Sequence, residues 1–384
     1  MTTSDLLPSG ATAFERAAAE TMDATGGVSG GIAAMRTFKR VSIPGSLLPF
    51  LIYEYGLGAV SEYLPDADPL GAGIDWQRVR GTPQAVALAL DWIGYEAGIE
   101  EAPTTRTMWH RFQLEMDRVR DAETPDLSEI AFIAQESVAV RSELFRAFHG
   151  YDVRPLEWSR SAYGNSMWSA SSGVRIDGLS PKWSFGRGVE IKHEMTSLEL
   201  TALGAWQPLT DTGLIGWGVW AFDAGGVNDL GWGNFSWESS DATWIDYGEA
   251  ARLNLMASAL AGRPVWAVFR DAGGDVIGYR RARAASPVTA SPDGPYSVSG
   301  LPLTPYGLPT SFYVDAMTDF GDGAGQTAAT VSLLFDAVPN DTAKPGLQWA
   351  GPGDLSAGTE FATHPFSTPF GETVRERVRF HLTF

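Results

Sequence analysis

The distribution of apolar and polar residues divides the chain into two parts of different kinds. Up to about residue 150 apolar residues mostly recur at helical spacing, and beyond it short apolar segments alternate with glycine, proline and asparagine turns. We therefore predict an α+β protein, with a mostly helical N-terminal domain and a β-rich C-terminal region of one or two β-sandwich-like domains. The predicted divisions are a domain at 1–150, a connector at 151–190, a tryptophan-rich β region at 191–283 and a C-terminal β domain at 284–384.

The first predicted helix covers roughly residues 12–24. Thr12 and Glu15 have the spacing of a capping box, in which the hydroxyl and the carboxylate each bind a backbone amide at the helix start. A flexible connector is predicted before Met35, because glycine is unfavourable inside helices. Four glycines stand in this segment: Gly26, Gly27, Gly30 and Gly31.

Two further helices are predicted before residue 100. Ser46 suits the N-cap of a short buried helix, whose apolar residues follow at helical spacing: Leu47, Leu48, Leu51, Ile52 and Tyr55. Residues 64–73 are rich in Pro, Asp and Gly and predict a loop. Thr82 and Pro83 then predict another helix start, since threonine can cap and proline lacks an amide that would be unpaired there. That helix is expected to end at Gly94 or Gly98.

The next elements combine strand and helix patterns. Apolar and polar residues alternate over 109–118, which predicts a half-buried strand. Thr124 and Pro125 repeat the signal for a helix start, and apolar residues up to Phe148 predict one long or two shorter helices.

The second part of the chain carries short strand patterns, at 169–176, 189–193 and 265–269, with a hairpin over 269–276 and a C-terminal strand from Val378 to Phe384 that has one apolar face. The segment 284–309 is rich in Ser, Pro and Gly. It predicts either a linker or one long surface loop, and both interpretations stay open.

Composition restricts the set of partners. The chain has 46 Asp and Glu against 28 Lys and Arg, a net charge of −18, which repels phosphate backbones and anionic lipids. The N-terminus lacks the features of a signal peptide, and no apolar run is long enough to span a bilayer. We expect a protein made in a cytoplasm, with no nucleic-acid partner and no membrane insertion. Because Cys is absent, disulfides, thiolate metal sites and cysteine nucleophiles are excluded.

Candidate chemistry is sparse. The nucleophile-elbow, P-loop and HExxH motifs are absent from the sequence, and the five histidines are dispersed. We therefore expect no enzyme, no catalytic residue and no cofactor. Three carboxylates near a glycine loop are weak candidates for a Ca²⁺ site, although an ordinary solvated turn is the preferred interpretation because the spacing differs from an EF-hand: Asp315, Asp319 and Asp322.

Tryptophans gather between residues 216 and 247. They predict anchors in a protein interface first, a β core second and a sugar site third. For the sugar site, nearby carboxylates would serve a glycosidase: Glu238, Asp241 and Asp246. The interface candidates, including three leucines of the short helix, are Leu47, Leu48, Leu51, Trp217, Trp220, Trp232 and Trp237.

Three motifs occur in a fixed order: Leu6-Leu7-Pro8, Leu47-Leu48-Pro49-Phe50-Leu51 and Arg80-Gly81-Thr82-Pro83. With them, the first 150 residues resemble the tail protein I family of contractile-tailed phages, whose members are baseplate wedge components. The chain departs from the family in its first connector, which is a glycine run instead of a polar segment.

The resemblance implies a structural wedge protein of the virion baseplate, assembled in the host cytoplasm. Its partners would be other baseplate wedge proteins and a tail fibre or peripheral baseplate protein, and six copies per baseplate would follow from the sixfold symmetry of such tails. The alternative is a tail-associated glycan-binding or glycan-hydrolysing protein that acts through the tryptophan-rich region.

Overall fold

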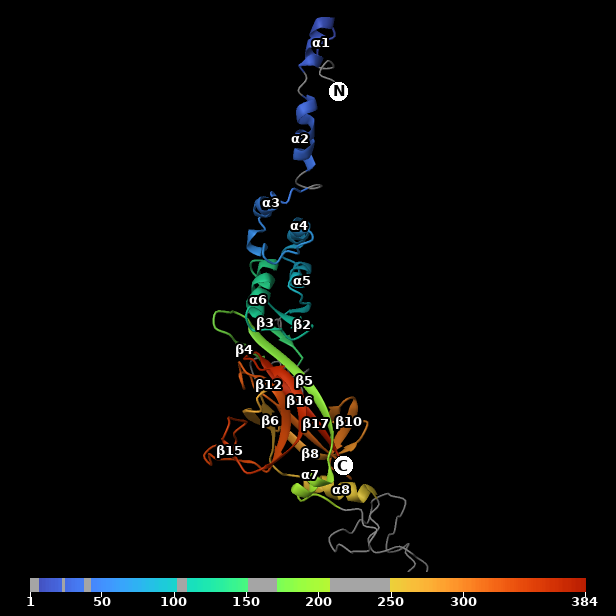
Figure 1. Cartoon of the computed structure of the whole chain (residues 1–384), viewed down its shortest axis with the longest axis vertical. Helices are drawn as coiled ribbons and strands as arrows, with labels where there is room; N and C mark the ends of the chain where they lie inside the picture. The colour runs from blue at the N-terminus through green and yellow to red at the C-terminus, as the bar shows by residue number, and fades with distance from the viewer. Residues whose placement is uncertain (1–6, 23–24, 38–42, 102–108, 151–170, 208–248) are drawn as a thin grey trace, which may run out of the picture. The chain divides into compact units, whose positions relative to one another are not determined.

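A computed structural model of the chain describes six segments, 7–22, 25–37, 43–101, 109–150, 171–207 and 249–384 (Figure 1). The chain divides into two compact units, the first formed by Met1–Tyr95 with Phe132–Arg141, and the second by Glu96–Ala131 with Ser142–Phe384. The predicted fold class is confirmed, because N-terminal helices are followed by a region of several β-sheets.

The first two helices differ in how well the sequence predicted them. Helix α1, Ala13–Thr21, begins with the predicted capping box: the Glu15 amide donates to Thr12 Oγ1 at 3.3 Å, and the Thr12 amide donates to the Glu15 carboxylate at 2.6 Å. Helix α2, Thr25–Thr37, occupies the segment for which a flexible connector was predicted, so that prediction is wrong. Glycine, unlike proline, keeps its amide donor, and it therefore weakens a helix without interrupting the hydrogen-bond ladder.

Helix α3, Leu48–Glu54, is followed by a short 3₁₀ turn, Gly58–Val60. The N-cap of α3 is Leu47 and not Ser46, with no side-chain cap. The prediction of a buried helix is wrong for most of its residues, because among them only Leu51 is buried. Helical spacing marked the apolar residues correctly but could not say how many of them the unit covers.

Helix α4, Pro69–Val79, begins inside the segment predicted as a loop. The Asp68 side chain accepts a hydrogen bond from the Gly71 amide, and Pro69 takes the first helical position. Asp and Pro therefore act as helix-start residues here and not as turn residues. Gly73 allows close packing, since a Cβ on it would lie 2.3 Å from Leu57 Cδ1.

Helix α5, Pro83–Trp92, confirms the predicted start at Thr82 and Pro83. The Thr82 hydroxyl donates to the Val79 carbonyl at 2.7 Å instead of capping the helix, and Gly94 follows with φ +73°.

Helix α6, Asp126–Ser137, ends well before Phe148. The predicted continuation is wrong, because Glu143–His149 forms strand β3. A short apolar run fits a helix or a buried strand equally, and pairing with neighbouring strands decides between them.

The larger sheet of the second unit has ten strands among the described residues, in the order β1-β2-β3-β5-β17-β11-β8-β10-β9, with β4 paired to β5. The strand bounds are β1 Ala97–Glu101, β2 Arg111–Met116, β4 Val174–Arg175, β5 Lys182–Glu194, β8 Ala284–Ala290, β9 Tyr296–Val298, β10 Leu301–Pro305, β11 Ser311–Met317 and β17 Val374–Thr383. Strands β2 and β17 confirm the two alternating patterns that the sequence predicts at 109–118 and 378–384.

Strands β8, β9 and β10 show that neither predicted interpretation of 284–309 is correct. The turn-forming residues lie between short strands, where Ser299, Gly300, Tyr306 and Gly307 have positive φ. A composition averaged over the whole segment hides strands as short as three residues.

The second sheet has five strands in the order β14-β7-β6-β12-β16. They are β14 Trp349–Ala350, β7 Val276–Arg281, β6 Val265–Arg270, β12 Thr327–Phe335 and β16 Thr359–Pro369, and a separate pair is formed by β13 Val338–Pro339 and β15 Leu355–Ser356. The predicted hairpin over 269–276 is confirmed by antiparallel β6 and β7.

The two sheets share one hydrophobic core. It contains apolar side chains of both sheets, including Phe312, Val378 and Phe380 of the larger sheet and Phe269 and Phe335 of the smaller one. Helices α7, Ser197–Ala202, and α8, Glu249–Ala259, add buried Leu200 and Met256 to the same core. Burial of each such side chain contributes roughly 1.5–3 kcal/mol.

Strand β5 is the longest element of the larger sheet and has 13 residues. Its start pairs in parallel with β3, from Arg146↔Lys182 to His149↔Phe185. It then runs parallel to β17 from Val374↔Phe185 to Thr383↔Glu194 (Figure 1). One strand therefore joins the β1–β3 part of this sheet to the part that forms the sandwich.

The close approach after β3 gives a test of this junction. Gly150 has φ +72°, and a Cβ on it would lie 2.3 Å from the Gly186 carbonyl oxygen in β5. Gly178 has φ +87°, but a Cβ on it would meet nothing within 4 Å. We expect Gly178→Ala to lower the free energy of unfolding by about 1–2 kcal/mol and Gly150→Ala by roughly 2 kcal/mol more, measured by urea denaturation. Equal losses would contradict the close packing.

Candidate functional site

Apolar side chains are exposed along the N-terminal helices. Helix α1 has no buried residue, and Phe14 and Met22 are each 82% exposed. Val28 and Ile32 of α2 are also exposed, as are Phe50 and Tyr53 of α3. Helices in water normally place such residues against a core, so this surface has the character of a protein-binding surface.

The predicted interface residues fall in two groups. Among the leucines of the α3 segment, Leu47 is exposed, Leu48 is half-buried and Leu51 is buried. The second group lies outside the described residues, together with the carboxylates considered for sugar hydrolysis: Trp217, Trp220, Trp232, Trp237, Glu238, Asp241 and Asp246.

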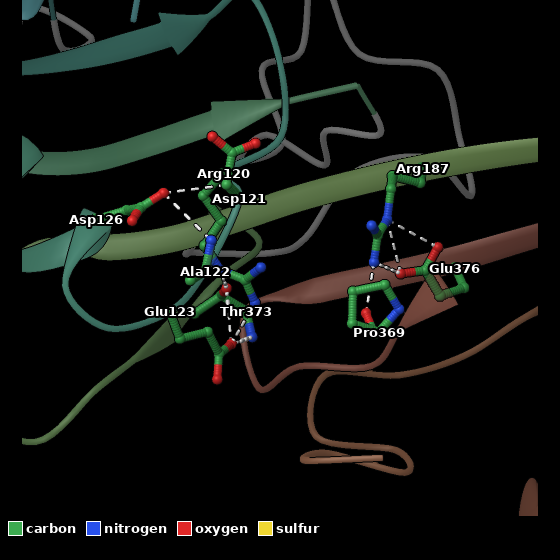
Figure 2. Close-up of polar contacts among 9 residues, drawn as sticks. All are labelled: Arg120, Asp121, Ala122, Glu123, Asp126, Arg187, Pro369, Thr373 and Glu376. Atoms are coloured by element: carbon green, nitrogen blue, oxygen red, sulfur yellow. Dashed lines mark hydrogen bonds and ion pairs between the residues drawn. The ribbon is translucent and has the colours of Figure 1, made fainter. Parts of the chain in front are cut away.

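An ionic cluster joins distant parts of the second unit, and we define it as Arg120, Glu123, Arg187, Thr373 and Glu376 (Figure 2). Arg120, Thr373 and Glu376 are buried, and the other two residues are half-buried. Arg120 lies in the loop between β2 and α6, where its Nη2 is 2.5 Å from Glu123 Oε1. Its Nε donates to Thr373 Oγ1 at 2.9 Å. The Thr373 amide and hydroxyl both donate to the same Glu123 oxygen, at 2.9 and 3.0 Å.

The surrounding backbone is shaped for these contacts. The Asp126 carboxylate accepts from the amides of Asp121 and Ala122, which closes the loop that presents Arg120 (Figure 2). Gly371 leaves the necessary room, because a Cβ on it would lie 2.2 Å from Arg120 Nη2. The loop after β2 is therefore attached to the turn between β16 and β17.

The second half of the cluster is an ion pair across β5 and β17. Arg187 Nη2 is 2.5 Å from Glu376 Oε1, and its Nε is 3.0 Å from the same atom. Arg187 Nη2 also donates to the Pro369 carbonyl at 2.6 Å. Glu376 is only 1% exposed, so its carboxylate depends on these donors for the interactions that water would otherwise supply.

The two carboxylates of the cluster respond differently to their surroundings. Burial raises the pKa of Glu376, and the guanidinium groups of Arg187 and Arg120 oppose that rise. Burial also acts to raise the pKa of Glu123, but the hydrogen bonds from Arg120 and Thr373 outweigh it and leave that pKa lowered. Glu123 is thus held ionised by its donors. For Glu376, the arginines offset only part of the free-energy cost of burying the carboxylate.

The ionic cluster was missed by the sequence analysis. Its partners lie 189 residues apart for Arg187 and Glu376 and 253 for Arg120 and Thr373, beyond the reach of local motifs. One signal was present. Glu376 falls in the inward register of the C-terminal strand with Val374 and Val378, and a carboxylate on an apolar face requires a buried cationic partner.

The three aspartates considered as cation ligands each have an arginine partner. Asp315 Oδ2 is 2.8 Å from Arg377 Nη2, Asp319 Oδ1 is 2.9 Å from an Arg375 nitrogen, and Asp322 Oδ2 is 3.1 Å from an Arg280 nitrogen. Burial raises the pKa of Asp322. Within the described segments, no three His, Asp or Glu side chains gather as metal ligands.

Two histidines that are distant in sequence meet between the sheets. His193 Nδ1 of β5 is 3.2 Å from His364 Nε2 of β16, and His193 Nε2 is 3.2 Å from Glu199 Oε1 of α7. These histidines are dispersed in the sequence, where 171 residues separate them.

Comparison with known families places the N-terminal segment. Residues 7–141 match the family model described as Phage tail protein (Tail_P2_I). This part of the chain is similar to phage tail proteins. The match supports a structural role in a phage tail and a place in the virion, and it includes Arg120 and Glu123 of the ionic cluster. No curated protein matches the chain.

In the segments that the structure describes, no helix has the combined length and hydropathy needed to cross a bilayer.

Removing Arg187 should destabilise the fold more than neutralising its partner Glu376. Arg187→Ala leaves the buried Glu376 carboxylate without its main donor, and we expect a loss of roughly 3–5 kcal/mol in the free energy of unfolding at pH 7. Glu376→Gln keeps an acceptor for Arg187 and should cost less than about 2 kcal/mol. As a control, Arg78→Ala removes an ion pair in which both side chains are more than two-thirds exposed, and it should cost less than about 1 kcal/mol.

The Arg187→Ala loss should depend on pH. Removal of the guanidinium raises the folded-state pKa of Glu376 further above its ordinary value of 4.5. A raised folded-state pKa stabilises the fold below the unfolded value, and this stability is lost as pH rises through the folded value. The deficit relative to wild type should therefore shrink from pH 7 to pH 5 in urea denaturation. A deficit independent of pH would contradict the proposed role of the carboxylate.

Proposed function

We propose that this phage tail protein is a wedge component of a contractile-tail baseplate, with α1 to α3 packed against other wedge proteins. In this proposal the C-terminal sandwich connects to a tail fibre or a peripheral baseplate protein. The observation that carries the proposal is the exposure of apolar side chains on helices within the segment that matches the tail protein family.

The energetics of short helices support a packed N-terminus. Helix α1 has nine residues and buries none of them. Isolated helices of that length are marginal in water, because nucleation is costly and few hydrogen bonds repay it. A capping box and one apolar face stabilise such a helix fully only when a partner covers Phe14 and the alanines that follow it.

Helix α2 supports the same conclusion by a different feature. A Cβ on any of its four glycines would meet nothing within 4 Å: Gly26, Gly27, Gly30 and Gly31. The fold of this chain therefore does not require glycine there. A neighbouring protein whose backbone approaches α2 closely would require it, since glycine is the residue that permits such an approach.

The remaining features agree with a scaffold role. A net charge of −18 favours protein partners over nucleic acid. The single core shared by the two sheets gives a rigid body for attachment. In a sixfold-symmetric baseplate the proposal implies six copies of the chain.

The double variant Phe50→Ser, Tyr53→Ser tests the packing of α3. Both residues are 72% exposed, so we expect the free energy of unfolding to change by less than about 0.5 kcal/mol per site. Incorporation into assembled tails should fall strongly, because the partner surface loses two aromatic contacts. Incorporation is measured by quantitative immunoblotting of purified particles.

The control is Leu198→Ser in α7, which removes an apolar side chain that is 80% exposed but lies outside the matched segment. It should incorporate like wild type. Normal incorporation of the double variant would refute the role of α3. If wild-type protein were absent from purified tails and instead released reducing ends from host polysaccharide, the glycan-hydrolase alternative would replace the wedge proposal.

A further inference from the structure

The contact between His193 and His364, the histidine pair, links the two sheets of the sandwich directly. His193 belongs to β5 of the larger sheet and His364 to β16 of the smaller one. Their rings meet edge to face, with centroids 5.3 Å apart and an interplanar angle of 89°. Their facing nitrogens, 3.2 Å apart, are at hydrogen-bond distance, so one of the two must donate and the other accept.

Glu199 fixes which protonation states satisfy this contact. With both rings neutral, His193 donates from Nε2 to the Glu199 carboxylate and accepts at Nδ1 from His364 Nε2. With one added proton, His193 donates from both nitrogens and His364 accepts. With a second added proton both facing nitrogens carry hydrogen, so the hydrogen bond is lost and two cations face each other.

The carboxylate itself is held in place. Glu199 is the third residue of α7, where it accepts from the Thr196 amide and hydroxyl in a capping box. Burial would raise the pKa of Glu199, but these hydrogen bonds and His193 outweigh it and leave the pKa lowered. Glu199 therefore stays ionised in mild acid, and the added protons go to the histidine pair.

Among the residues that the structure describes, the other elements around the pair bring no further charge to His364. The aromatic ring of Phe380 in β17 has its centroid 6.2 Å from that of His364, and the register partner of His364 in β12 is Val331. On β5, Lys192 and Glu194 alternate with His193 and so point to the opposite face of the sheet. Burial lowers the pKa of His364, and the charge of His193 lowers it further, while Glu199 opposes both.

The strand that His364 holds is an irregular edge strand. Strand β16 lies at the edge of the smaller sheet, and its pairing with β12 shifts register on either side of Val331↔His364. Ala362, two residues before His364, has φ +54°, a backbone conformation that is unfavourable for a residue with a Cβ. Contacts other than the ladder must therefore contribute to the position of this part of β16.

We propose that the histidine pair is an acid-sensitive connection between the sheets, which holds β16 in place near neutral pH and releases it when both rings are protonated. The release is local, because the shared core and the ionic cluster do not depend on the pair. The proposal is independent of the wedge assignment.

Hydrogen–deuterium exchange of the full chain at pH 7.5 and 5.5, corrected for intrinsic exchange rates, tests the proposal. The opening of 359–369 should increase about tenfold in acid, because at pH 5.5 a histidine with the ordinary pKa of 6.5 is about tenfold more often protonated than neutral. In His364→Gln the side-chain amide still donates to His193 Nδ1 without titrating. The increase in this variant should be less than about twofold.

His110→Gln is the matched control, since His110 lies beside Glu143 and away from the sheet contact. It should keep the wild-type response. An equal acid response in wild type and His364→Gln would overturn the proposal, as would NMR titration curves in which His193 and His364 both protonate independently near pH 6.5. A stable complex of the pair with added Zn²⁺ at pH 7.5 would also overturn it, because the pair would then be a metal site.

Discussion

The parallel pairing of strand β5 is the constraint on which the second unit depends. Buried backbone N–H and C=O groups must find partners, and β5 finds them first in β3 and then along the whole of β17. The sheet therefore continues without interruption from β1 to the sandwich. The Arg187–Glu376 ion pair ties these two strands by their side chains as well. Arg120 and Thr373 attach the loop after β2 to the same place.

Local signals predicted much of the fold. The capping box at Thr12, the start at Pro83 and the alternation in β2 and β17 are written in a few neighbouring residues, and each was confirmed. Where tertiary contacts decide whether a segment becomes a helix or a strand, local sequence patterns did not predict the element. The run that forms β3 becomes a strand because β2 and β5 lie on either side of it. Strands β8 to β10 are short and lie between turn residues, and their antiparallel pairing within the sheet is what makes them strands.

The residues of the candidate site could also be predicted only in part. Helical spacing identified the apolar residues of α3 but not that Leu51 faces inward while Phe50 and Tyr53 face water. The ionic cluster and the histidine pair join residues more than 170 apart, and such pairs leave only indirect marks, such as a glutamate on an apolar strand face. The buried Glu376 carboxylate has a partner, Arg187, that the fold brings to it from another strand.

In the proposed function, partner proteins cover the N-terminal helices of this chain in an assembled tail. Cryo-electron microscopy of the intact particle tests it most directly. The account predicts density for the chain in the baseplate, in sixfold-symmetric arrangement, with Phe14, Val28 and Phe50 buried against neighbouring tail proteins. Density in which these side chains face solvent, or a tail that lacks the chain, would contradict it.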